Sequence, residues 1–285
     1  MARIDPVVGK YIYLDVQGIQ YRVFFEENGE GIPLICLHTM GSTAQDWRYI
    51  LNDEEITSRY RVIAADLPYH GRSLPPESVE WWKQEYRLTK SFLIDFIVGI
   101  CRALGLEKPV YMGCSIGGFL APDLALECPD EFRAVIGLES AISGGLYTPS
   151  LFYHPEVSND FRFANVLHAA GPTSPEKYVR QLCWVASQSA PSVCGGDLYY
   201  YFMDHDLTDR AREIDTSRVA VYLLTGEYDP TSSPEDTRKL AGLIKGAEFT
   251  EMKGLSHFPM AENPEVFKKY LMPILDEIAG RGIIA

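Results

Sequence analysis

The sequence predicts a doubly wound α/β sheet, mostly parallel, with a helical segment inserted between two of its strands. Short apolar runs without polar alternation recur along the chain, and segments with helical periodicity separate them. Continuous apolar runs indicate strands that are covered on both faces, as in a parallel sheet. Alternation of such strands with helices predicts helical layers on both sides of the sheet.

The order of the elements follows from these runs. The chain is expected to open with an antiparallel hairpin, because alternating apolar residues flank the turn residues Gln17-Gly18. The hairpin strands are expected at 11–16 and 20–26, further strands at 33–37, 60–65, 109–112, 134–138, 219–225 and 247–252, and clear helices at 92–104 and 119–127.

The strand–helix rhythm breaks between about residues 143 and 217, where aromatic residues are frequent. We interpret this stretch as a mostly helical cap, 143–216, inserted into a core formed by 1–142 and 217–285. Most of its aromatics are expected to pack the cap onto the core. Tyr153, Phe161 and Trp184 are the candidates to contact a substrate.

Length, charge and cysteine content exclude several classes of function. A chain of 285 residues can form one large domain with an inserted cap. The formal charge of −13, from 39 acidic and 26 basic residues without a basic cluster, makes nucleic acid an unexpected partner. No stretch suits a bilayer span or a signal peptide, so no membrane association is expected. Six scattered cysteines favour reduced thiols in the cytoplasm, and the sequence does not indicate an oligomeric state.

The most informative motif is Gly113-Cys114-Ser115-Ile116-Gly117-Gly118, between an expected strand and an expected helix. A small-x-Ser-x-small pentad in this position predicts a tight, strained turn that exposes the serine hydroxyl at the carboxyl edge of a sheet. The adjoining helix N-terminus favours developing negative charge. The pentad also occurs by chance, but its placement makes Ser115 a candidate nucleophile.

A serine nucleophile needs a base, and the base needs a carboxylate to orient it. The turns after the last two expected strands present Asp229 and His257. Ligands of open α/β sheets bind at the carboxyl ends of strands, so we expect Ser115, Asp229 and His257 to form a triad. Glu227, in the same turn, and Glu139, after another strand, are the competing acids. Asp229 is favoured because it ends the turn.

Acyl transfer also needs donors for the oxyanion of the tetrahedral intermediate. One donor is expected from the backbone N–H of Ile116, directly after the candidate nucleophile. The other is expected from the backbone N–H of Met40, in the loop that follows the expected strand at 33–37.

With these motifs the chain resembles the α/β-hydrolase superfamily, and the resemblance covers almost all of its length. It is most similar to capped esterases and carbon–carbon bond hydrolases with a G-x-S-x-G-G elbow. Relatives that cleave epoxides or haloalkanes have Asp at the elbow, where this chain has Ser115. The segments that carry the resemblance are 38–41, 66–73, 113–118, 226–229 and His257.

Three positions depart from the usual patterns of this superfamily. Thr39 stands where the oxyanion loop commonly has Gly, so it is either strained by a positive φ or places a hydroxyl in the site. Tyr69 also replaces a Gly. Phe258 follows the candidate His, where the carbon–carbon hydrolases commonly have Trp, and it is a candidate substrate contact together with Thr39.

The expected function is hydrolysis of a small, apolar or aromatic carboxylic ester by a Ser-His-Asp acyl-enzyme mechanism. Amide or carbon–carbon bond cleavage on the same triad remains open, as does a non-hydrolytic lyase, a cofactor-free oxygenase or a ligand sensor with slow turnover. This chemistry requires no cofactor. The histidines show no metal-ligand spacing, so no metal is expected either.

Overall fold

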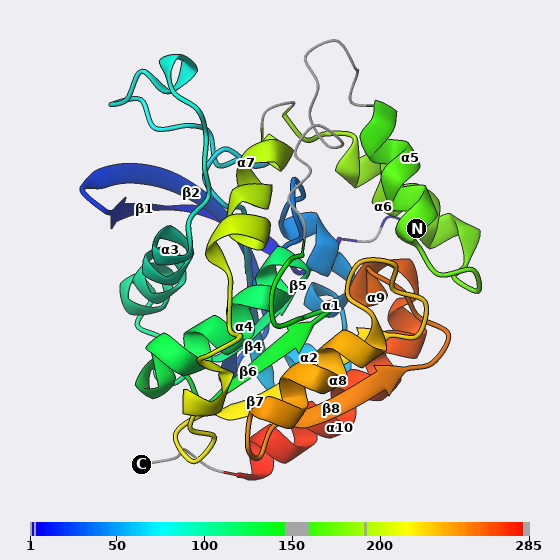
Figure 1. Ribbon diagram of the computed structural model, residues 1–285. Coiled ribbons are helices and arrows are strands. Elements are labelled where there is room, and N and C mark those ends of the chain that lie inside the picture. Colours follow the sequence, from blue (N-terminus) through cyan, green and yellow to red (C-terminus); the bar gives the residue numbers. More distant parts are fainter. Residues whose placement is uncertain (1, 3, 146–159, 191–192, 282–285) are drawn as a thin grey trace.

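The computed structural model of the chain describes all residues except 1, 3, 146–159, 191–192 and 282–285, and only the backbone of Asp160 and Phe161. Its strands form a single eight-stranded sheet in the order β1-β2-β4-β3-β5-β6-β7-β8 (Figure 1). β2 pairs antiparallel with β1 and β4, and the remaining neighbours are parallel. The strands are β1 Val8–Val16, β2 Ile19–Asn28, β3 Ile32–Leu37, β4 Tyr60–Ala65, β5 Val110–Cys114, β6 Ala134–Leu138, β7 Ala220–Gly226 and β8 Glu248–Met252.

The predicted strands are confirmed, and the bounds of β4 and β6 agree with those expected from the sequence. β5, β6 and β7 are buried at every position, which explains why their sequences are continuously apolar rather than alternating. The hairpin β1–β2 reaches Val8 and Asn28, beyond the predicted bounds. Those extra residues are mostly exposed or half-buried, so hydrophobic patterning could not identify them.

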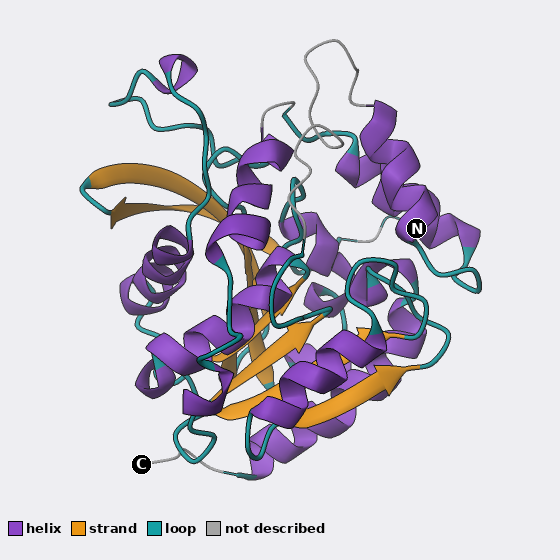
Figure 2. Ribbon diagram, viewed as in Figure 1, coloured by secondary structure: helices purple, strands orange, loops and turns teal. Residues whose placement is uncertain are grey.

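The two faces of the sheet support separate hydrophobic cores. Along β3, Ile35 and Leu37 face the core that contains α3, α4 and α8, whereas Leu34 and Cys36 face the core that contains α1, α2 and α10. Figure 2 shows these helices around the strands. The helices are α1 Arg48–Leu51, α2 Glu54–Thr57, α3 Lys90–Ala103, α4 Ile116–Glu127, α5 Asp160–Ala169, α6 Glu176–Ala186, α7 Val193–Tyr199, α8 Pro234–Leu243, α9 Pro259–Glu262 and α10 Pro264–Gly280.

The segment between β6 and β7 contains α5, α6, α7 and the π-helical turn Tyr200–Asp204. We call the described part of this segment the β6–β7 insertion. In Figure 1 its helices lie at the top of the molecule, away from the lower helices α8 and α10. The helical character expected between about 143 and 217 is therefore present in the described part of that range.

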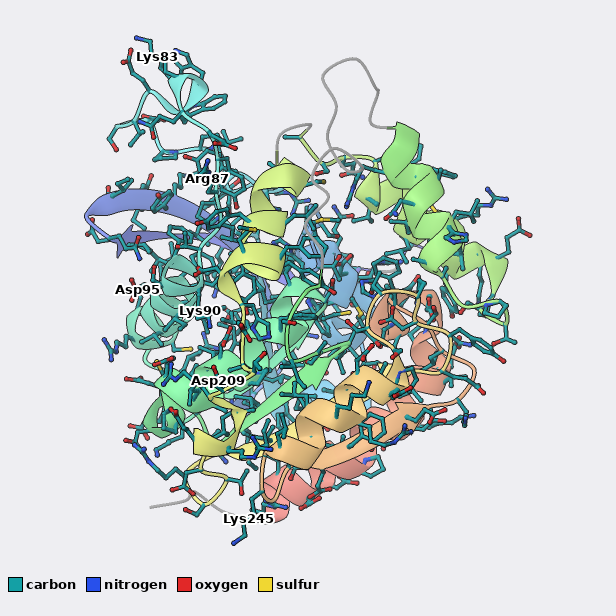
Figure 3. The ribbon with its side chains drawn as sticks, in the orientation of Figure 1. Lys83, Arg87, Lys90, Asp95, Asp209 and Lys245 are labelled. Carbon is teal, nitrogen blue, oxygen red and sulfur yellow. The ribbon has the colours of Figure 1, made fainter. Side chains whose placement is uncertain are left out.

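A second excursion, residues 74–89, follows β4 and extends from the body of the protein. Its far end carries the short helix Trp81–Lys83, and Figure 3 labels Lys83 at its tip. Trp81 and Trp82 are both exposed. The Trp81 ring makes edge contacts with the rings of Trp82 and Tyr69, and neither tryptophan belongs to either hydrophobic core.

All six cysteines are described, and none forms a disulfide. Within the described ranges, no helix combines the length and apolar character needed to cross a membrane.

Candidate active site

Ser115 occupies a strained turn between β5 and α4. Its φ of 57° and ψ of −115° lie outside the regions that serine normally adopts. The flanking glycines make the turn possible because a Cβ at Gly113 would lie 2.4 Å from the backbone of Gly117. A Cβ at Gly118 would lie 1.8 Å from the carbonyl oxygen of Leu138. The glycines on both sides of Ser115 are therefore required by close backbone approach, as the sequence predicts.

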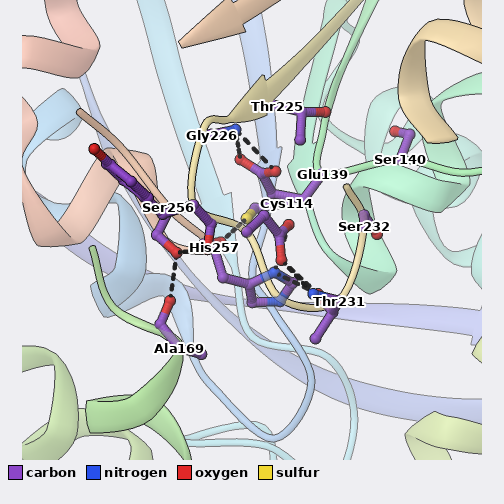
Figure 4. Close-up of polar contacts among 12 residues, drawn as sticks. Cys114, Glu139, Ser140, Ala169, Thr225, Gly226, Thr231, Ser232, Ser256 and His257 are labelled. Atoms are coloured by element: carbon purple, nitrogen blue, oxygen red, sulfur yellow. Dashed lines mark hydrogen bonds and ion pairs between the residues drawn. The ribbon is translucent and has the colours of Figure 1, made fainter. Parts of the chain in front are cut away.

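His257 and Asp229 meet at the carboxyl ends of β8 and β7. His257 Nδ1 lies 2.9 Å from Asp229 Oδ2. Thr231 fixes the carboxylate, since its backbone N–H and its hydroxyl donate to Asp229 Oδ1 at 2.7 and 2.8 Å (Figure 4). The Thr231 hydroxyl oxygen also lies 2.8 Å from His257 Nδ1. Our sequence reasoning missed Thr231, although Asp-x-Thr after a strand is a recognisable turn signal.

The electrostatics of this pair are those of an imidazole held by a carboxylate. Burial alone would raise the pKa of Asp229, but His257 and the hydrogen bonds to the carboxylate lower it to about 2. Burial alone would lower the pKa of His257, but the charge and hydrogen bond of Asp229 raise it above 6.5. Asp229 is therefore ionised at neutral pH, and it stabilises a proton on the imidazole.

Neither of the two competing carboxyl groups bonds to His257, and Glu139 bonds instead to Asp229 itself. Glu139 accepts from the backbone N–H of Gly226 at 3.0 and 3.1 Å (Figure 4). Burial, together with the nearby charge of Asp229, raises the pKa of Glu139 well above its usual range. Glu227 accepts from the backbone N–H of Gly254 and pairs with Lys253. Only Asp229, among these three described carboxyl groups, bonds to His257.

The loop after β3 is ordered by a buried carboxylate. Asp46 accepts from both the backbone N–H and the hydroxyl of Thr39 at 3.2 Å. Thr39 does not have a positive φ, whereas Gly41 does, at 59°. The threonine is therefore unstrained, and its hydroxyl is held by Asp46. Met40 N–H has no partner among the described residues, and Ile116, the first residue of α4, has none within its helix.

These elements surround a cavity of about 300 Å³. Ser115 and His257 both line it, although these two described side chains do not form a direct hydrogen bond. Such bonds often tighten only when substrate binds. The lining residues are Thr39, Met40, Ser115, Ile116, Gly144, Arg162, Asn165, Val166, His168, Ala169, Leu198, Tyr201, Phe202, Pro230, Thr231, His257 and Phe258.

The cavity brings together most of the predicted site residues. Thr39, Met40, Ile116 and Phe258 line it with Ser115 and His257, and Asp229 lies directly behind His257.

Of the three insertion aromatics that were predicted to contact a substrate, only Trp184 has a described side chain. Trp184 is 70% exposed on α6 and does not line the cavity. Tyr153 lies outside the described residues, and the side chain of Phe161 is not described. Tyr201 and Phe202 are the insertion aromatics that the described structure brings to the cavity.

The His257 loop is tied to the β6–β7 insertion. The carbonyl of Ala169, at the end of α5, accepts from the Ser256 hydroxyl at 2.8 Å and from His257 N–H at 3.4 Å. Glu262 accepts from the backbone N–H groups of Ser256 and Gly171. Burial raises the pKa of Glu262 to about 7. No local motif marks the link from Glu262 to the insertion, because Gly171 lies 91 positions away in sequence.

The described residues contain no cluster of three or more side chains suited to hold a metal ion. The sheet order, the strained serine after β5 and the His–Asp pair after β8 and β7 are features typical of a hydrolase on a doubly wound sheet. A sequence model of the alpha/beta hydrolase family matches residues 34–269, which include all three of these side chains. The chain belongs to the alpha/beta hydrolase family.

Similar proteins include several named hydrolases. The chain is 20% identical to an uncharacterized carboxylesterase of Bacillus subtilis (strain 168), over 96% of this chain and 89% of that one. It is 26% identical to 2-hydroxymuconate semialdehyde hydrolase of Pseudomonas putida, over 52% of each chain. Among solved structures, a thermophilic esterase from Thermogutta terrifontis superposes with a TM-score of 0.80 at 19% identity, over 94% of this chain and 99% of that one. At that identity, the structural likeness establishes the fold alone.

Proposed function

We propose that this protein hydrolyses a small carboxylic ester, with Ser115 as nucleophile, His257 as general base and Asp229 as the carboxylate that orients the base. The observation that carries the proposal is the 2.9 Å contact between His257 Nδ1 and Asp229 Oδ2, beside a cavity that His257 shares with a strained Ser115. Nucleophile, acid and base also follow one another along the chain in the order of this family. The name of the Bacillus subtilis relative agrees with an ester as the bond cleaved.

In the first half of the reaction, Ser115 Oγ attacks the ester carbonyl carbon and His257 Nε2 accepts the hydroxyl proton. Nε2 is the nitrogen that remains for this task because Nδ1 faces Asp229 and Thr231. The tetrahedral intermediate then expels the alcohol, which takes the proton from His257 and leaves an acyl group on Ser115. Asp229 remains ionised and stabilises the imidazolium.

In the second half, His257 takes a proton from water, and the resulting hydroxide attacks the acyl group. The carboxylic acid leaves, and Ser115 regains its proton from His257. At both stages the oxyanion accepts from the backbone N–H groups of Met40 and Ile116. No step in this scheme uses a cofactor or a metal.

We further propose that residues 143–216 form a cap that sets specificity, over a catalytic core of 1–142 and 217–285. In support, α5 and the aromatics Tyr201 and Phe202 line the cavity together with Ser115. Among these lining residues, Val166, Tyr201 and Phe202 suit a substrate whose body is apolar.

Cleavage of a carbon–carbon bond is the second candidate function. It is favoured by the similarity of about half the chain to 2-hydroxymuconate semialdehyde hydrolase. A panel of para-nitrophenyl esters of increasing acyl length, assayed beside an activated diketone, separates the two reactions.

The decisive experiment concerns the nucleophile. Ser115→Ala should fold normally and lose about 10³-fold or more in kcat, because nucleophile and base act as a unit. A fluorophosphonate should label Ser115 in the wild-type protein, and isotopically labelled water should place its oxygen in the acid product. Labelling of Cys114, or turnover that survives in Ser115→Ala, would contradict the proposal.

A further inference from the structure

One charged side chain in the cavity has no part in the proposed mechanism. Arg162, on α5, lines the cavity with Ser115 and is only 4% exposed. It lies on the same face of α5 as Val166 and Ala169, at the i+4 and i+7 positions, and both of those residues also line the cavity. A cation therefore stands in a largely apolar lining.

Arg162 forms no ion pair with a carboxylate among the described residues. Its Nη2 donates to the neutral carbonyl of Met40 at 2.8 Å, and its buried Nε has no hydrogen-bond partner. The buried Asp197 on α7 accepts instead from Gly41 N–H at 2.7 Å and pairs with His70 at 2.9 Å. Withdrawing a guanidinium from water without a counter-charge is strongly unfavourable. A cavity that retains such a group is suited to receive an anion.

We propose that Arg162 binds a carboxylate of the substrate, so that the preferred substrate is a small ester that also carries a carboxylate. This inference rests on the proposed ester hydrolysis at Ser115 and adds a substrate class to it. A planar guanidinium can hold a carboxylate through two parallel N–H···O bonds, which both neutralise the charge and fix its orientation. The carboxylate anchors one end of the substrate, and the apolar lining accommodates the remainder.

The bond from Arg162 to the Met40 carbonyl points to a second possible role, which is support of the loop that carries the proposed oxyanion donor. The two roles predict different patterns of rates. Loss of loop support lowers the rate for every substrate by the same factor, whereas loss of anion binding lowers it only for substrates with the carboxylate. The ratio of the rates for two substrates that differ only in the carboxylate therefore reports anion binding, because loss of loop support cancels from it.

The kinetic test compares mono-(para-nitrophenyl) glutarate with the same ester methyl-capped at its free carboxylate. The uncatalysed rates, measured without enzyme, are subtracted. The wild-type protein should favour the free carboxylate, and Arg162→Met should lower the ratio of the two kcat/KM values by about 10- to 100-fold. Arg162→Lys keeps the charge without the planar fork and should lower the ratio less. Arg180→Met removes an exposed arginine from α6 and is the matched control, with no change expected.

A second pair of substrates locates the carboxylate on the molecule. Para-carboxyphenyl butyrate against phenyl butyrate places it in the leaving alcohol rather than in the acyl chain. A preference that depends on Arg162 in either pair supports the proposal.

Calorimetric titration of glutarate into Ser115→Ala protein measures the anion site without turnover. Binding that disappears when Arg162→Met is added supports the proposal, and neutral glutaramide should not bind. Hydrolysis retained by Ser115→Ala would refute the proposed function while leaving anion binding intact. The anion site would be overturned if Arg162→Met lowered the rate equally for both members of each pair and if the Ser115→Ala protein did not bind glutarate.

Discussion

Replacement of Asp229 by Asn tests the proposed triad because the structure dictates how the amide must lie. The backbone N–H of Thr231 can only donate, and it lies 2.7 Å from Asp229 Oδ1. The amide oxygen of Asn must take that position, since an amide NH2 there would face another donor. The amide NH2 then occupies the Oδ2 position, 2.9 Å from His257 Nδ1. His257 must accept at Nδ1 and carry its proton on Nε2, so it can no longer accept the proton of Ser115.

The expected loss is large and confined to the chemical step. A wrong imidazole tautomer lowers kcat by about 10⁴-fold, or about 5 kcal/mol of transition-state stabilisation. KM should change little because Asp229 does not line the cavity. Glu139→Gln is the matched control, since Gln keeps the size of Glu139, and burial together with the Asp229 charge already raises the pKa of this carboxyl group well above its usual range, towards the uncharged form. Gln can still accept from Gly226 N–H, so its kcat should stay within about threefold of wild type.

The assay is the initial rate of nitrophenolate release over a range of ester concentrations, with circular dichroism to verify folding. A collapse of kcat in Glu139→Gln, with near-normal turnover in Asp229→Asn, would transfer the orienting role to Glu139. Equal losses in both variants would mean that the two carboxyl groups act as a single unit.

The remaining predictions concern pH and backbone packing. Activity requires neutral His257, whose pKa is raised above 6.5 by Asp229 against the effect of burial, so kcat/KM should fall as the pH drops through that raised pKa. Glu262→Gln removes the neighbouring group of pKa about 7 and should leave this acid limb in place, and disappearance of the limb would assign it to Glu262. Gly118→Ala drives a Cβ to 1.8 Å from the carbonyl of Leu138, and it should lower the free energy of unfolding by about 2 kcal/mol or more. Gly99→Ala, inside α3 with nothing within 4 Å, should raise it by about 0.5–1 kcal/mol in the same urea titration, and equal effects of the two alanines would contradict the packing argument.

The strands and the catalytic candidates could be predicted because their signals are local. β6 is buried at every position, and the continuous apolar run in its sequence predicts this burial. Ser115 was predicted because close backbone approach requires small neighbours, and these neighbours are adjacent in sequence. Asp229 and His257 each follow a recognisable strand, so topology alone brings them to one edge of the sheet.

The cavity lining could be predicted only in part. Aromatic composition identified the β6–β7 insertion but not which aromatics face inward. The exposure of Trp184 could have been predicted from helical periodicity. Val179, Leu182, Cys183 and Ala186 form a buried i, i+3, i+4 and i+7 series on α6, and Trp184 lies outside that series. No sequence signal predicted that Arg162 lines the cavity, because its contact with Met40 joins residues 122 positions apart. Its burial follows from tertiary packing alone.

The hydrogen bonds between the β6–β7 insertion and the His257 loop limit how far this enzyme can be treated as modular. Ala169 and Gly171 bond to the loop and to Glu262, and Thr173 donates to the carbonyl of Gly254 at 2.8 Å. A chimaera that exchanged the whole of 143–216 would keep these bonds only if its new turn placed a backbone carbonyl and N–H at the same positions; otherwise the loop and its imidazole would shift as the pocket changed. The seam of a successful graft therefore lies N-terminal to Ala169. Natural or laboratory selection for a new substrate can vary α5 more freely than the turn that follows it.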